Sequence, residues 1–212
     1  MRWLCKGLVV VGVLLGLSAS AYAQGFLESS AARRISQETG IPQQLIRAMF
    51  VEEDDAQFIL AFIYINEQTL AGRLKPEIQT AITPFVQRNA LLVLVVPARS
   101  SFFDPFAISF VQNIFRIALE PQMVTPITPD FAAGVLPSDV VSAGVIALDS
   151  RVLAEQPFEI QYAGGYSATF SLNPESAAPT GSGSSGGWVF GDGLRFLLLN
   201  LLFLFLFPFL LV

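Results

Sequence analysis

The last stretch of the chain, residues 194–212, constrains the fold more than any other. It reads LRFLLLNLLFLFLFPFLLV and contains one charge, Arg195, and one amide, Asn200. As a helix, residues 196–212 would extend about 25 Å at roughly 1.5 Å per residue, close to the thickness of a bilayer's hydrocarbon core. The alternative, a buried helix of a soluble core, would leave no polar face for water. We therefore expect a C-terminal transmembrane helix that anchors the chain to a membrane.

The opposite end, residues 1–23, has the pattern of a secretory signal peptide. Arg2 and Lys6 supply a positive start, residues 7–17 form an uncharged apolar run, and residues 21–23 read Ala-Tyr-Ala. Small residues at the first and third of these positions are what signal peptidase requires. We expect cleavage after residue 23; an uncleaved signal anchor is the alternative, for which the apolar run is short.

Cleavage there would leave a chain with neither cysteine nor histidine, because Cys5 is the only cysteine. Disulfides, zinc sites of the usual kinds and triads that use histidine are then excluded. Three of the 12 basic residues lie outside residues 24–193 and all 17 acidic residues lie inside, which leaves a net charge of about −8. Such a segment does not bind nucleic acid by neutralising phosphates, and it repels anionic headgroups.

Residues 24–172 form the extracytoplasmic domain, for which we expect an α+β fold. Helical spacing predicts short N-terminal helices over 28–38 and 42–50 and a helix over 74–88. An aromatic and β-branched run predicts a strand over 58–65. Residues 90–96 (ALLVLVV) are apolar without alternation, which indicates a strand covered on both faces. A strand, a helix and a strand in this order allow a parallel pair.

The remainder of the domain is expected to be mainly β. Two strands over 106–110 and 114–119, or one long bent strand, are predicted with Gln112-Asn113 between them. Another strand is predicted over 140–148, where Gly144 marks a bulge or a close approach. Residues 158–172 predict a hairpin whose turn is Ala163-Gly164-Gly165. This hairpin and the loop at 136–139 are similar to immunoglobulin-like sandwiches of exported proteins, without the cysteine pair and the core tryptophan. The resemblance covers less than half of the chain and implies a sandwich-like fold.

Residues 173–193 are expected to be a linker rich in glycine, serine and proline, too polar to form a core. Small residues followed by an apolar tail also resemble a GPI-attachment signal, with residues 182–186 as attachment positions. The pair at 186–187, Gly-Gly, resembles an element of bacterial sorting signals, which normally end in basic residues that are absent here. Both alternatives would have the tail removed.

The densest charge in the chain is the run Glu52-Glu53-Asp54-Asp55. Carboxylate oxygens suit calcium, so these four residues are candidate metal ligands. Consecutive residues of a regular element point in different directions, however, and the spacing of a calcium loop is absent. The alternative is a solvated turn.

Four aromatic residues are candidate contacts for a ligand or a protein partner: Phe102, Phe103, Tyr162 and Tyr166. Aromatic side chains often dominate interfaces. In a chain with 19 phenylalanines, the alternative is that each belongs to the core.

The sequence does not predict a catalytic residue or a cofactor. Paired carboxylates remain as an alternative, a hydrolase that uses two of Asp104, Asp130, Asp139 and Asp149, and a calcium-stabilised adhesion domain is another. Our main expectation is an exported, membrane-anchored, non-catalytic domain that binds or assembles at the cell envelope. Its expected partners are the membrane, through the tail, and an envelope protein, but not nucleic acid.

The intact mass of the protein extracted from the membranes of its host tests the two ends of the chain. We expect a mass that corresponds to residues 24–212, from a cleaved signal peptide and a retained tail. A mass that ends between residues 182 and 187 would instead show that the tail is a sorting or lipid-attachment signal.

Overall fold

The computed structural model describes residues 25, 27–54 and 56–172. These residues form a mainly β structure with three sheets and few helices, an α+β fold as expected. The signal peptide, the linker and the C-terminal helix of the sequence analysis lie outside the described residues. Within the described ranges, none of the helices has both the length and the apolar character needed to cross a bilayer.

The largest sheet, sheet A, has five antiparallel strands. In spatial order they are β1 (Ile46–Glu52), β2 (Gln57–Tyr64), β3 (Ala90–Pro97), β9 (Ser142–Ala147) and β7 (Val124–Pro126). The expected central strand at 90–96 is confirmed, since all eight residues of β3 are buried. The last strand, β7, is short and ends in a proline, as is usual at the edge of a sheet.

A second antiparallel sheet, sheet C, has four strands, and a third sheet has two. Sheet C contains, in spatial order, β11 (Tyr166–Phe170), β10 (Phe158–Tyr162), β5 (Ile108–Gln112) and β6 (Phe115–Ala118). The third sheet pairs β4 (Ser101–Phe103) with β8 (Gly134–Leu136). The hairpin predicted over 158–172 is confirmed, as is the pair of strands on either side of Gln112-Asn113.

The helices are short. Residues 27–39 are helical, and the other helical segments are η1 (Gln43–Leu45), α2 (Glu67–Leu70), α3 (Pro76–Ile82), η2 (Thr83–Phe85), η3 (Pro105–Ala107) and η4 (Pro121–Met123). The helix expected over 74–88 is therefore present in shortened form as α3 and η2, with Pro84 in the 3₁₀ turn.

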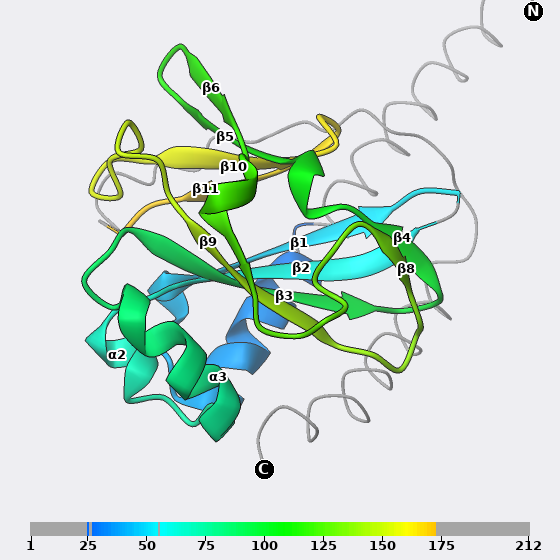
Figure 1. Cartoon of the computed structure of the whole chain (residues 1–212), viewed down its shortest axis with the longest axis horizontal. Helices are drawn as coiled ribbons and strands as arrows, with labels where there is room; N and C mark the ends of the chain where they lie inside the picture. Colours follow the sequence, from blue (N-terminus) through cyan, green and yellow to red (C-terminus); the bar gives the residue numbers. More distant parts are fainter. Residues whose placement is uncertain (1–24, 26, 55, 173–212) are drawn as a thin grey trace, which may run out of the picture.

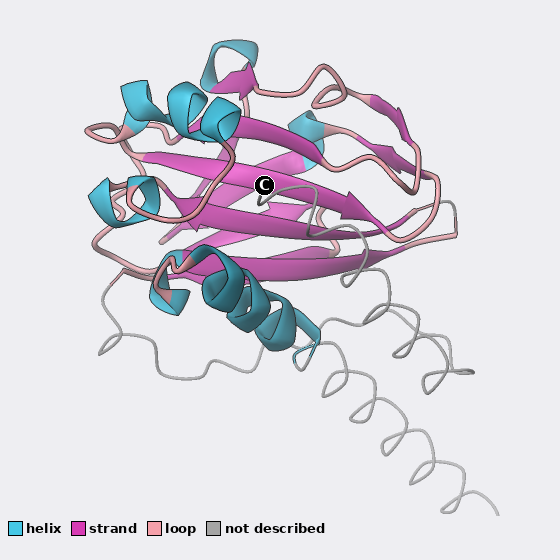
Figure 2. Cartoon of the chain, turned by 90° about the horizontal axis from the view of Figure 1, so that it is seen from below, coloured by secondary structure: helices cyan, strands magenta, loops and turns pink. Residues whose placement is uncertain are grey.

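The molecule has three layers, with sheet A in the middle. The helix at 27–39, α2 and α3 lie on one side of sheet A and sheet C lies on the other (Figure 1). Seen from the side of the helices, the strands of sheet A run behind them (Figure 2). One apolar core joins the helices to sheet A, with Ile35 and Ile78 among its members, and a second core joins sheet A to sheet C, with Phe62 and Phe110 among its members.

Side-chain contacts join the two large sheets where β1 passes β11. The Nε atom of Arg47 donates to the carbonyl oxygen of Thr169 at 3.0 Å, and the guanidinium lies 5.4 Å from the ring centre of Phe170. A second nitrogen of Arg47 donates to backbone carbonyls of its own segment, the nearest being Ile46 at 2.7 Å. Backbone oxygens and an aromatic face thus hold this charge in place.

The helix predicted over 42–50 is wrong: after the single turn η1, the chain enters strand β1. The apolar residues that suggested a helix, among them Ile46 and Met49, are buried on both faces of the strand. Pairing with β2 in register, Ile46 opposite Ile63, outweighs the local helical spacing because every residue of β1 gains a partner strand.

The expected parallel pair is also wrong, because β2 and β3 are antiparallel. Tyr64, the last residue of β2, lies opposite Leu91 at the start of β3, and the Ile65 N–H donates to the carbonyl of Ala90 at 3.0 Å. The helices α2 and α3 thus belong to a connection between two adjacent antiparallel strands, which starts and ends at the same end of sheet A. The chain does not cross to the other end of the sheet.

Gly144 in β9 marks a close approach, one of the two roles expected for it. A Cβ atom at this position would come within 2.2 Å of the Phe131 ring. Phe131 is buried and packs against Phe103 with ring centres 5.5 Å apart, so it has little freedom to move. Only a residue without a side chain lets this ring lie on the sheet.

We expect Gly144→Ala to lower the free energy of unfolding by about 1–3 kcal/mol, as overpacking of a core does. Circular dichroism during thermal or urea unfolding measures the loss. Gly165→Ala is the matched control, because no atom lies within 4 Å of a Cβ there. Adding Phe131→Leu to Gly144→Ala should recover part of the loss; no loss in the single variant would contradict the steric explanation.

Candidate interaction surfaces

The four aromatic residues predicted as contacts divide into surface and core. Phe103 and Tyr162 are buried, with 0% and 5% of their surface exposed, so the expectation that they lie at the surface is wrong. Their rings stack with centres 6.2 Å apart, and both meet the edge or face of Phe58. They fill the core between sheets A and C.

Phe102 is exposed, as predicted, with 49% of its surface accessible. Successive residues of a strand point to opposite faces, so Phe102 points outward while Phe103 points into the core. The residue opposite Phe102 on β8 is Val135, which is 66% exposed. Directly paired side chains lie on the same face, so Phe102 and Val135 form an apolar pair on the outer face of the β4–β8 sheet.

Tyr166 is half-buried, and its hydroxyl joins two strands. The Glu52 N–H donates to this hydroxyl at 3.3 Å, and the hydroxyl donates to the carbonyl of Glu52. Tyr166 stands at the start of β11 and Glu52 at the end of β1. Burial raises the pKa of Tyr166, so the hydroxyl keeps its proton for this contact. Its structural role is to fasten sheet C to sheet A.

The acidic run lies at the turn between β1 and β2. Glu53 and Ala56 exchange backbone hydrogen bonds across the turn, and Arg99 donates to the carbonyls of Glu53 and Asp54, both at 2.8 Å. Arg99 thus binds backbone carbonyls of the acidic run. Among the described residues, which do not include Asp55, no three or more carboxylates, histidines or cysteines gather in an arrangement that could hold a metal.

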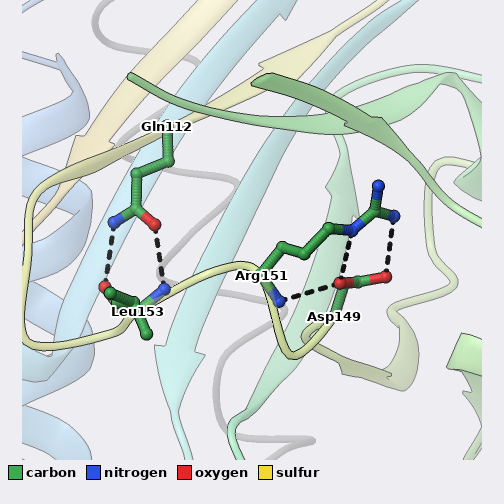
Figure 3. A network of polar contacts seen from close by, with 4 residues as sticks. All are labelled: Gln112, Asp149, Arg151 and Leu153. Atoms are coloured by element: carbon green, nitrogen blue, oxygen red, sulfur yellow. Dashed lines mark hydrogen bonds and ion pairs between the residues drawn. The ribbon is translucent and has the colours of Figure 1, made fainter. Parts of the chain in front are cut away.

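The four aspartates considered for a hydrolase lie in separate loops. Asp104 accepts from the Phe106 N–H at 2.9 Å and caps η3. Asp149 accepts from the backbone and the side chain of Arg151, at 2.8 Å in each case (Figure 3). These hydrogen bonds lower the pKa of Asp149 to about 2. Asp130 and Asp139 are exposed in the loops on either side of β8.

The sequence analysis missed two exposed apolar residues of the β5–β6 hairpin, one in the turn and one at the start of β6. Ile114 is 90% exposed and the adjacent Phe115 is 57% exposed. The turn is made by Asn113, whose φ of 58° lies in the left-handed region that asparagine tolerates. The sequence signal for this exposure was an Asn followed by two large apolar residues, because turns usually carry small or polar residues.

The base of this hairpin is fixed by Gln112, a buried polar residue. Its amide donates to the carbonyl of Leu153 at 2.9 Å, and its side-chain oxygen accepts from the Leu153 N–H at 2.9 Å (Figure 3). The same amide lies 3.3 Å from the carbonyls of Gln156 and Pro157. Gln112 therefore fastens the loop before β10 to the hairpin, and the apolar turn begins from a rigid base.

Glu28, in the first helix, has an unusual environment for a carboxylate. Burial raises its pKa from 4.5 to about 7, and the Phe50 N–H, at 3.5 Å, lowers it only in part. A carboxyl group that titrates near neutrality is a common feature of catalytic acids. Among the described residues, Glu28 does not belong to a group of three or more carboxylates that could hold a metal. The raised pKa of Glu28 instead affects the stability of the fold.

The raised pKa of Glu28 makes the folded state less stable as the pH rises. Below pH 4.5 Glu28 is protonated in both the folded and unfolded states; as the pH rises to about 7 the unfolded state loses the proton first, so stability falls. We expect Glu28→Gln to remove about 2–3 kcal/mol of this pH dependence. Unfolding midpoints measured across this range check it, with Glu155→Gln, at an exposed carboxylate, as the control. Equal slopes for Glu28→Gln and the parent protein would contradict it.

The described surface thus presents two apolar features, the Phe102–Val135 pair and the turn that carries Ile114 and Phe115. Tyr162 stacks on Phe103 and lies opposite Ile108, at the end of β5 that is remote from Gln112. The two features therefore lie at opposite ends of sheet C. Comparison with protein-family models, with curated proteins and with solved structures finds no match to this chain.

Proposed function

We propose that this protein is an exported, membrane-tethered, non-catalytic domain that binds a protein partner at the cell envelope. In this proposal residues 1–23 are a signal peptide, residues 24–172 are a sandwich-like domain outside the cytoplasm, residues 173–193 are a linker, and residues 194–212 are the membrane helix. The proposed contact is the apolar pair of Phe102 and Val135.

The observation that carries the proposal is the position of this pair. The described chain ends just after Phe170, which lies one residue beyond the row of Val111, Glu159 and Thr169, as Gln112 does on β5. The segment that leads to the apolar tail therefore leaves sheet C at the Gln112 end, and the pair lies at the other end. A tether at one end leaves the other end free to meet a partner.

The arrangement of charge also favours binding over catalysis. The candidate aspartates are distributed over separate loops, and two of them bind backbone or arginine groups of their own loops. A carboxylate hydrolase needs two such groups on one substrate bond. An apolar pair with two exposed side chains instead suits a protein surface that has a hydrophobic centre.

A photo-cross-linking amino acid at position 102 tests the proposal in host membranes. We expect one defined protein adduct that is lost when Val135→Asp is added, because the charge disrupts the apolar contact. Leu153→Asp is the matched control and should leave the adduct unchanged, because Leu153 is 46% exposed and its backbone is bound to Gln112 at the opposite end. An adduct that survives Val135→Asp, or no adduct at all, would show that this face is not the contact surface.

A further inference from the structure

The β5–β6 turn is the second apolar feature, and its chemistry differs from that of the Phe102–Val135 pair. It protrudes from the molecule as a narrow hairpin (Figure 1). Ile114 lies in the turn at its tip and is 90% exposed, and Phe115, the first residue of β6, is 57% exposed beside it. A narrow tip with two large apolar side chains has little area for a protein interface, but it can enter the boundary between headgroups and acyl chains.

The tip lies at the end of the domain from which the chain continues to the tail. Val111 in β5, Glu159 in β10 and Thr169 in β11 form one row across sheet C. Adjacent strands are about 4.8 Å apart, so β5 and β11 are separated by about 10 Å at this row. The next residues along the two strands are Gln112 and Phe170. Ile114 lies two residues beyond Gln112, and the described chain ends two residues beyond Phe170.

The hairpin itself carries no carboxylate, although Glu159 of the neighbouring β10 and Glu155 of the loop bound by Gln112 lie at the same end. Residues 105–119 contain no carboxylate, although the domain as a whole is acidic, and their one charge is Arg116. Arg116 donates to Ser109 and Gln161 and does not pair with a carboxylate in these contacts. The acidic run lies at the far end, because Glu52 is bound to Tyr166, which is opposite Tyr162. A tip without carboxylates can approach a bilayer from which the acidic end is kept away.

We infer that the β5–β6 turn docks the domain on the bilayer, with Ile114 and Phe115 inserted at the interface. The occupant is a lipid surface of low negative charge, the membrane in which the tail is proposed to lie. This inference rests on the proposed membrane tether and adds an orientation to it: the Gln112 end faces the bilayer, and the Phe102–Val135 pair faces away.

The test uses the full chain with Cys5→Ser, so that an introduced cysteine is the only one. Ile114→Cys is labelled with an environment-sensitive fluorophore, and the protein is reconstituted into phosphatidylcholine vesicles whose acyl chains carry a nitroxide. Val135→Cys is the matched control, an exposed β-branched residue at the opposite end of the domain. We expect quenching at 114 to be stronger than at 135 by about twofold or more, with a blue-shifted emission.

Adding Phe115→Asp to the labelled Ile114→Cys protein should reduce quenching to the level at 135, with an unchanged circular dichroism spectrum. Flotation of the vesicles separates the two proposals. A chain that does not float with the vesicles overturns the tether and the docking together. A chain that floats with equal quenching at both positions keeps the tether and overturns the docking. A blue shift at 114 without quenching by the lipid nitroxide shows a protein contact and also overturns it.

Discussion

The structure depends on strands that are covered on both faces, of which β3 is buried along its whole length. In β3, Leu92, Leu94 and Val96 belong to the core shared with the helices, and Leu91, Val93 and Val95 belong to the core shared with sheet C. Successive residues of a strand point to opposite faces, so an uninterrupted apolar run is what two cores require. Among the residues that the structure describes there is no cysteine, and these two cores replace the disulfides that many exported domains use.

The segments that sequence reasoning identified are those in which local chemistry and tertiary position agree. The run at 90–97 has one interpretation only, and the Ala163–Gly165 turn, with φ of 49° and 71° at its first two residues, fixes its own hairpin. Residues 46–52 are different, because their apolar spacing satisfies a helix and a doubly covered strand equally. Pairing with β2 decides between them, and the local spacing carries no information about that partner. Local spacing likewise does not determine whether β3 runs parallel or antiparallel to β2, because it carries no information about the partner strand.

The surface was harder to predict than the fold. Phe102 and Phe103 are adjacent and chemically identical, yet one is half exposed and the other is buried. Which of them points inward depends on the pairing of β4 with β8, some thirty residues further on. The apolar pair of Ile114 and Phe115 predicts a strand, and Phe115 is the first residue of β6. Ile114 instead lies in the turn, where the left-handed backbone of Asn113 reverses the chain.

The arrangement of the two ends of sheet C explains how the proposed tether would assist insertion of the β5–β6 tip into a bilayer. Two inserted side chains bind a bilayer weakly on their own, but a chain already attached to that bilayer makes insertion intramolecular and raises the effective concentration of the tip. The benefit depends on the tip lying at the end of sheet C where the described chain leaves β11. The row of Val111, Glu159 and Thr169, one residue before Gln112 and Phe170, places the tip at that end. Five-residue strands then separate this end from Tyr162 and Tyr166 by roughly 17 Å. A domain held in this way keeps its acidic turn and its Phe102–Val135 pair away from the headgroups and directed toward a partner.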